Sequence, residues 1–215
     1  YVARAVDSAL AQTYRPIEVI VVDDGSTDHS REQLSEYGKR IQLILQDNAG
    51  QPRALNRGFQ ICKGAVIALL DSDDLFAPTK IARLVEVFER NPQAQWIFHE
   101  LDYIDASGAS LPVDSLADRD DLRSILRRRN RYPAFASIDL RQSFAAGEKL
   151  PYTAPALSAL SFRRDALAAI LPMPEDIARA SDEFPKIAAL ALFPGIHLGE
   201  ALARQRIHGA NAATF

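Results

Sequence analysis

The chain has 215 residues, of which 47% are apolar and 25% are charged, and its formal net charge is −3. These values are ordinary for a globular protein, and the charge gives no electrostatic signature for binding nucleic acid. No apolar run approaches the roughly 20 residues that span a bilayer. The one cysteine, Cys62, excludes an internal disulfide and is typical of a reducing compartment.

Up to residue 100, short apolar runs alternate with segments of helical periodicity. This rhythm predicts an α/β domain with a doubly wound, mostly parallel sheet flanked by helices. Helices are predicted over 2–10, 28–38, 52–62 and 78–88, and strands over 17–22, 41–46, 64–70 and 95–99. Because Tyr1 stands at the start of a helix already under way, we expect a further strand to precede it.

Residues 101–160 lose this rhythm. They contain a turn at 105–108 and a predicted helix near 119–130 that ends in the basic run RRRNR at 127–131. Helical periodicity returns over 163–171 and 182–193. We interpret the irregular stretch as an excursion that shapes one edge of a ligand site.

Two acidic clusters follow predicted strands. Asp23 and Asp24 end the first apolar run, and the segment 71–74, Asp-Ser-Asp-Asp, ends the third. Ligands of open α/β sheets collect at the carboxyl ends of strands, so both clusters are expected on one rim. Asp71 and Asp73 can converge on Mg²⁺ or Mn²⁺, which take oxygen ligands. The alternative is a pair of solvated loops with N-capping aspartates.

Between these clusters lies the segment 48–58, NAGQPRALNRG. Gly50 and Gly58 allow close backbone approach, Asn56 offers an amide, and Arg53 or Arg57 can face phosphate oxygens. The alternative is a loop followed by a helix whose arginines point outward.

Taken in order, VIVVDDGSTD, NAGQPRALNRG, GAVIALLDSDD and the terminal RIHGAN resemble the family 2 glycosyltransferases, which have the GT-A fold. The resemblance implies a metal-dependent, inverting transfer of a sugar from a nucleoside diphosphate donor, with UDP expected, and a Mn²⁺ or Mg²⁺ cofactor. It also implies one domain in two halves, 1–110 for the nucleotide sugar and 111–215 for the acceptor.

The same resemblance implies roles for individual residues. Asp73 would ligate the metal, with Asp71 as a second ligand and towards the ribose or sugar. Many members have an arginine where this chain has Leu55, which leaves the diphosphate-binding cation open between Arg53, Arg57 and Arg206. The residues expected to contact the donor nucleotide are Asp23 and Asp24 at the base, and Asn48, Gly50 and Asn56 in the pocket.

The resemblance also implies roles for residues in two segments near the end of the sequence. Asp182 is the first choice for the general base and Glu183 the second, the alternative being exposed carboxylates at a helix N-terminus. His208 is expected to complete the metal shell or bind the diphosphate, the alternative being a structural histidine.

The resemblance also has implications for the partners of the protein and for its location in the cell. It implies a saccharide, lipid-linked or protein acceptor and a cytoplasmic location at the inner membrane face, where the run at 127–131 would allow peripheral contact. It does not indicate the oligomeric state. Two other interpretations remain open: a receiver-like phosphoacceptor domain, which also places aspartates after strands, and a sugar-nucleotide-binding protein without turnover.

Overall fold

The computed structural model describes residues 1–112, 133–148, 156–177 and 182–208, so the predicted helix near 119–130 and the basic run at 127–131 lie outside the described part. The helices are α1 (Val2–Leu10), α2 (Ser30–Ser35), α3 (Gln51–Ile61), α4 (Lys80–Arg90), α6 (Arg141–Ala145), α7 (Arg164–Ile170) and α8 (Glu183–Leu192), with 3-10 turns η1 (Gly38–Arg40) and η3 (Leu157–Ala159). The strands are β1 (Ile20–Asp24), β2 (Gln42–Gln46), β3 (Val66–Ala68), β4 (Leu75–Phe76), β5 (Trp96–Ile104), β6 (Ser110–Leu111), β7 (Phe135–Ile138), β8 (Leu160–Arg163) and β9 (Gly195–Arg206). Among these helices, none is both long enough and apolar enough to cross a membrane.

The described strands form two sheets. β1 and β2 pair in parallel, and the others form a mixed sheet in the order β3-β8-β5-β9-β4, with β6 on β5 and β7 on β9. In the larger sheet β5 and β9 are parallel, whereas the remaining described pairs are antiparallel. The α/β class is confirmed, but the expectation of a mostly parallel sheet is wrong. The cause is that β8 and β4 run against their neighbours, and each lies next to a strand distant in sequence.

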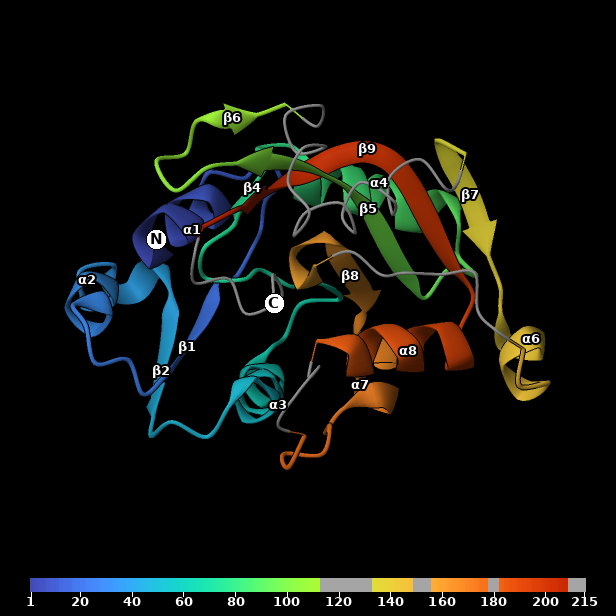
Figure 1. The fold of residues 1–215 in the computed structure, drawn as a ribbon, viewed down its shortest axis with the longest axis horizontal. Helices are drawn as coiled ribbons and strands as arrows, with labels where there is room; N and C mark the ends of the chain where they lie inside the picture. Colours follow the sequence, from blue (N-terminus) through green and yellow to red (C-terminus); the bar gives the residue numbers. More distant parts are fainter. Residues whose placement is uncertain (113–132, 149–155, 178–181, 209–215) are drawn as a thin grey trace.

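Helices cover both faces of the larger sheet (Figure 1). Side chains of β5 alternate between the two faces, as the pleat requires. Trp96 and Phe98 pack in one cluster with residues of α7 and α8, while Ile97 packs in another with residues of α4. The run of apolar residues at 96–98, at the start of β5, therefore follows from burial on both faces, and the predicted flanking by helices is confirmed.

A smaller core fixes β1 and β2. Val6 of α1, Leu34 of α2 and Tyr37 pack over this pair, and α3 lies close enough that a Cβ added at Gly58 would be 3.4 Å from Val22 Cγ2. The strand β1 extends to Asp24, two residues beyond the predicted end at 22. Asp23 and Asp24 therefore belong to the strand and their positions are fixed by its ladder.

Gly195→Ala is expected to destabilise the fold. An added Cβ at Gly195 would lie 2.1 Å from Cε2 of Trp96, a ring that is 1% exposed and cannot move aside. Overpacking of this kind costs about 1–3 kcal/mol, which urea unfolding would measure. Gly58→Ala is the matched control, because a helical alanine there makes only ordinary contacts and should leave stability unchanged or raise it. Equal unfolding midpoints for Gly195→Ala and the wild type would contradict the packing described here.

Candidate active site

Asp23 is held inside the protein. Its side chain is 1% exposed, and its Oδ1 accepts hydrogen bonds from Arg31 Nε at 2.6 Å and from Ser26 N at 3.2 Å. Burial alone would raise the pKa of Asp23, but the bonds from Ser26 and Arg31 outweigh burial and lower it. Asp23 was expected at the donor base, but its carboxylate is buried and bonded to Ser26 and Arg31, so this expectation is wrong.

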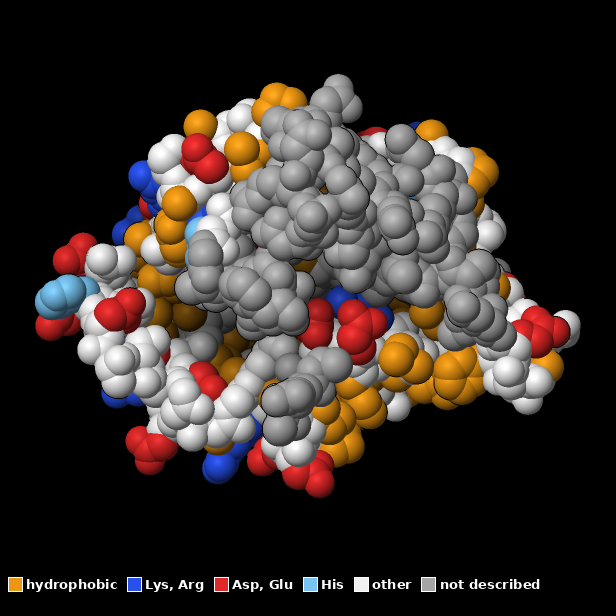
Figure 2. Space-filling view, in the orientation of Figure 1, with side chains coloured by type: hydrophobic (Ala, Val, Ile, Leu, Met, Phe, Trp, Pro, Cys, Tyr) orange, Lys and Arg blue, Asp and Glu red, His pale blue; other side chains and the backbone are white. Residues whose placement is uncertain are grey.

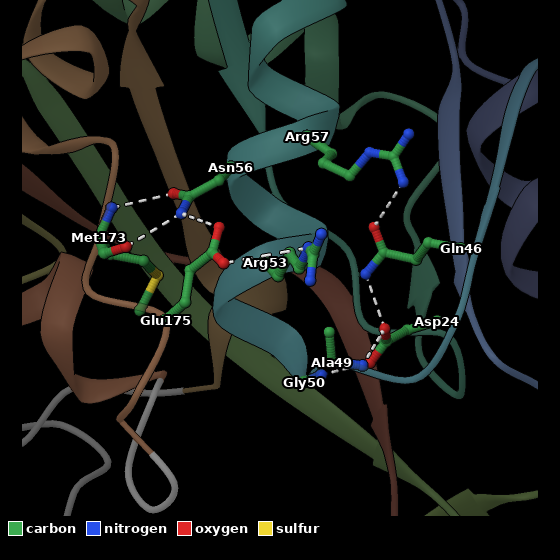
Figure 3. Close-up of polar contacts among 9 residues, drawn as sticks. All are labelled: Asp24, Gln46, Ala49, Gly50, Arg53, Asn56, Arg57, Met173 and Glu175. Atoms are coloured by element: carbon green, nitrogen blue, oxygen red, sulfur yellow. Dashed lines mark hydrogen bonds and ion pairs between the residues drawn. The ribbon is translucent and has the colours of Figure 1, made fainter.

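Asp24 organises the loop that follows β2 (Figure 3). Its Oδ1 accepts from Gln46 Nε2 at 2.6 Å and from Ala49 N at 2.8 Å, and its Oδ2 accepts from Gly50 N at 2.7 Å. Burial acts to raise the pKa of Asp24, but these three bonds lower it below its ordinary value. A carboxylate has about four acceptor positions, so roughly one remains for a ligand donor.

The loops after β1 and β2 touch each other. Gly25 has φ +82°, and a Cβ added there would lie 2.6 Å from Asn48 N, so only glycine fits this contact. Asn48 itself is exposed beside Asp24 and Gly50. Asp24, Asn48 and Gly50 are therefore brought together, as the sequence predicted.

Asn56 lies on the other side of α3 from Asp24 (Figure 3). Its Nδ2 donates to Met173 O and its Oδ1 accepts from Met173 N, both at 2.9 Å, and its side chain is buried. The expectation that the Asn56 amide lines the nucleotide pocket is therefore wrong. Asn56 instead anchors the chain after α7, and Nδ2 also contacts Glu175 Oε1 at 3.4 Å.

Asp71 lies in the segment after β3 and contacts the buried Ser158. Asp71 N donates to Ser158 Oγ at 2.9 Å, and the same hydroxyl lies 3.4 Å from Asp71 Oδ2. Burial raises the pKa of Asp71 to about 6, the charges of Asp73 and Asp182 add to the rise, and Lys186 opposes it. Asp71 is therefore within electrostatic reach of both Asp73 and Asp182.

Asp73 faces the end of the chain. Its Oδ2 lies 3.0 Å from His208 Nε2, so a carboxylate and an imidazole from distant segments meet as predicted. An oxygen and a nitrogen donor side by side suit a divalent cation that draws its other ligands from phosphate and water. Within the described ranges, no group of three or more His, Cys, Asp or Glu side chains forms a complete metal cage.

Arg206 was one of three candidates for binding the diphosphate, but in the structure its side chain braces the acidic segment. The residue is fully buried; its Nε donates to Asp73 O at 2.8 Å and its Nη1 donates to Asp105 O at 2.9 Å. Its backbone N donates to Asp74 Oδ1 at 2.8 Å, and burial raises the pKa of Asp74 to about 7. Asp74 and Arg206 are therefore supports beneath Asp71 and Asp73.

The candidate base residues begin α8. Asp182 Oδ2 and Glu183 Oε1 each lie 3.0 Å from Lys186 Nζ, whose side chain is 2% exposed. Figure 2 shows acidic side chains beside a basic one near the centre of this face, close to the start of α8 in Figure 1. Residues more than 100 positions apart thus form one acidic rim, which we define as Asp71, Asp73, Asp182 and Glu183.

Three supporting residues of this rim were missed by sequence reasoning. Lys80 is fully buried, donates from Nζ to Ser158 O at 2.6 Å and lies 3.9 Å from the Phe76 ring centroid. Burial lowers the pKa of Lys80 well below its ordinary value, against the opposing charges of Asp74 and Asp71. Lys186 stands at i+4 from Asp182, a spacing that can be read as an ion pair, whereas Ser158 and Lys80 carry no local signal.

Asp71→Asn is expected to stabilise the protein at neutral pH and to have little effect near pH 4. The folded state keeps the Asp71 proton up to about pH 6, while the ordinary pKa is 3.8. The wild type therefore loses stability as pH rises between these values, and the loss persists above them. Asparagine removes this loss, about 1–2 kcal/mol near pH 7 after allowance for solvent screening. Urea unfolding at both pH values measures it, and an equal effect at the two would contradict the assignment.

The sequence of the chain is similar to those of known glycosyltransferases. Residues 1–163 match the protein-family model described as Glycosyl transferase family 2. An uncharacterized glycosyltransferase of Nostoc sp. is 35% identical over 219 aligned residues, covering 98% of this chain and 62% of that protein. The chondroitin synthase of Escherichia coli is 34% identical over 111 residues, 50% of this chain and 16% of that protein. The chain thus spans less than two thirds of the length of these relatives.

Solved structures agree with the fold. S. aureus TarS 1–349 in complex with UDP superposes with a TM-score of 0.70 at 18% identity, covering 96% of this chain and 56% of that one. The mannosyltransferase PcManGT of Pyrobaculum calidifontis, in complex with GDP-Man and Mn²⁺, gives 0.64 at 18% identity, covering 98% and 54%. These likenesses confirm the predicted GT-A fold.

Proposed function

Because the chain belongs to glycosyl transferase family 2, we propose that it transfers a sugar from a nucleoside diphosphate, with UDP as the expected nucleotide, to an acceptor hydroxyl with inversion. The observation that carries this proposal is the acidic rim, where Asp71, next to Asp73 after β3, lies within electrostatic reach of Asp182 at the start of α8. Family membership sets aside the receiver-like alternative. A binding protein without turnover would need neither Asp182 nor its buried lysine partner.

On the donor side, we assign the nucleotide to the loops after β1 and β2. Asp24 would accept a hydrogen bond from the base, Asp23 would hold Asp24 through the strand, and Asn48 and Gly50 would line the pocket. The two halves then keep the predicted division, with residues 1–110 holding the donor and 111–215 shaping the acceptor side.

The donor set at Asp73 and His208, with Asp71 beside them, fits Mn²⁺ or Mg²⁺. Such cations usually bind through one or two carboxylates and take their remaining ligands from substrate phosphates and water. When bound, the cation would offset the negative charge that develops on the departing diphosphate.

Asp182 is the proposed general base. As the acceptor oxygen attacks the anomeric carbon, the carbon–oxygen bond to the diphosphate breaks, and Asp182 takes the hydroxyl proton. Inversion requires a single attack, so one carboxylate suffices. Lys186 touches Oδ2 of Asp182 and would hold that carboxylate towards the rim, with Glu183 as the second candidate.

The acceptor is proposed to be a saccharide, a lipid-linked sugar or a protein, met at the cytoplasmic face of a membrane. A thermal-shift screen with UDP-, GDP- and TDP-sugars and Mn²⁺ tests the donor part, because a ligand that binds only the native state raises the melting temperature. A shift with one nucleotide class is the expected result. No shift with any of them would contradict the proposal.

A further inference from the structure

A polar groove lies on the outer side of the Asp24 loop, between α2, the end of β2 and α3. Its volume is about 380 Å³, and it is lined by Arg31, Leu45, Gln46, Asp47, Arg53 and Arg57. None of these residues belongs to the acidic rim. Three guanidinium groups thus face one lining carboxylate, in a protein whose net charge is negative.

The three arginines differ in how their charge is compensated. Arg31 is fixed by buried Asp23 at 2.6 Å and by Gln46 O at 3.1 Å. Arg57 donates to the neutral amide oxygen of Gln46 at 3.4 Å (Figure 3). Arg53 Nε lies 3.9 Å from Glu175 Oε2, and the side chains of Arg53 and Glu175 are each about half exposed. An exposed pair at that distance compensates little charge.

The spacing of the two arginines on α3 strengthens the positive field. Arg53 and Arg57 are four residues apart, so their side chains share one face of the helix and repel each other. A bound anion would relieve this repulsion. Guanidinium groups suit a phosphoryl group best, since each fork can donate two parallel hydrogen bonds to its oxygens.

We propose that this groove binds a small hydroxylated phosphate ester, of the sugar phosphate class, at a site separate from the donor pocket. On this proposal Arg53 and Arg57, which the sequence left as candidates for the donor diphosphate, serve the groove instead. Arg53 and Arg57 bind the phosphoryl oxygens. The groove is larger than a phosphate ion needs, and exposed Leu45 and the Asp47 carboxylate offer an apolar surface and a hydroxyl acceptor for the organic part. Gln46 links the site to the donor side, because it contacts Arg57 through Oε1 and Asp24 through Nε2.

Isothermal titration with glucose 1-phosphate tests the proposal. We expect millimolar or tighter binding to the wild type and a loss of about tenfold or more in the double variant Arg53→Gln/Arg57→Gln. Arg90→Gln is the matched control, since Arg90 is an exposed helical arginine paired with Glu86 on α4; it should bind like the wild type. Melting curves check that each variant is folded.

A second variant separates this groove from the donor pocket. Asp73→Ala should retain glucose 1-phosphate binding, because Asp73 does not line the groove. Absence of binding to the wild type, unchanged binding in the double variant, or loss of binding in Asp73→Ala would each overturn the proposal. Binding of UDP is measured in the same variants. If only the groove proposal fails, UDP binds but glucose 1-phosphate does not. If only the proposed function fails, glucose 1-phosphate binds but UDP does not.

Discussion

Asp73→Ala is expected to reduce sugar transfer by on the order of 10²–10³-fold, because it removes the carboxylate that faces His208 at 3.0 Å. The variant would lose both the proposed metal ligand and the carboxylate that lies against the imidazole of His208. Donor affinity in the presence of Mn²⁺ should fall together with turnover. Calorimetry with the best donor from the screen and a coupled assay for nucleoside diphosphate release would measure the two quantities.

Ser72→Ala is the control for this variant. Ser72 is exposed and lies between Asp71 and Asp73, so its substitution perturbs the same loop without removing a carboxylate. It should bind and turn over the donor like the wild type. Wild-type donor affinity in Asp73→Ala with Mn²⁺ present would show that the metal and diphosphate are held elsewhere.

Asp182→Asn is the second large effect, and it should act on the chemical step alone. Removing a general base lowers kcat by on the order of 10²–10⁴-fold. Because asparagine keeps the shape of the side chain, donor affinity should change little. The activity that remains should depend less on pH than that of the wild type.

Glu183→Gln is a closely matched control, since Glu183 makes the same 3.0 Å contact to Lys186 as Asp182 does. We expect it to retain most of the activity. If Glu183→Gln were inactive and Asp182→Asn active, the base would be Glu183 and the present assignment would be wrong.

Local pattern predicted much of the first half of the fold. The run at 41–46 is found as Gln42–Gln46, and the periodicity of 2–10 is found as Val2–Leu10. The run at 95–99 continues to Ile104, however, because β5 pairs along its whole length with β9. β9 contains charged residues in a sequence that does not look like a strand, so its position depends on long-range pairing that local propensity does not carry.

In the candidate site too, some features could be predicted from local sequence, whereas others depend on long-range contacts. The resemblance implied that Asp24 and Gly50 both contact the donor nucleotide, and a hydrogen bond of 2.7 Å brings the two residues together. Motifs did not distinguish a ligand-facing arginine from a structural one. Arg206 was therefore kept among three candidates for the diphosphate, yet it binds backbone carbonyls. Ser158 could not be predicted, because its contact with Asp71 joins positions 87 residues apart.

If the acidic rim transfers sugar with inversion, the anomeric configuration of the first product will be opposite to that of the donor. Proton NMR can follow the wild type with the donor identified by the screen, Mn²⁺, and either an acceptor or water. We predict that an α-linked donor yields a β-linked product or β-sugar before mutarotation, and that Asp182→Asn yields almost none. An initial α-product, or equal rates in the wild type and Asp182→Asn, would show that the enzyme does not invert or that Asp182 is not the base.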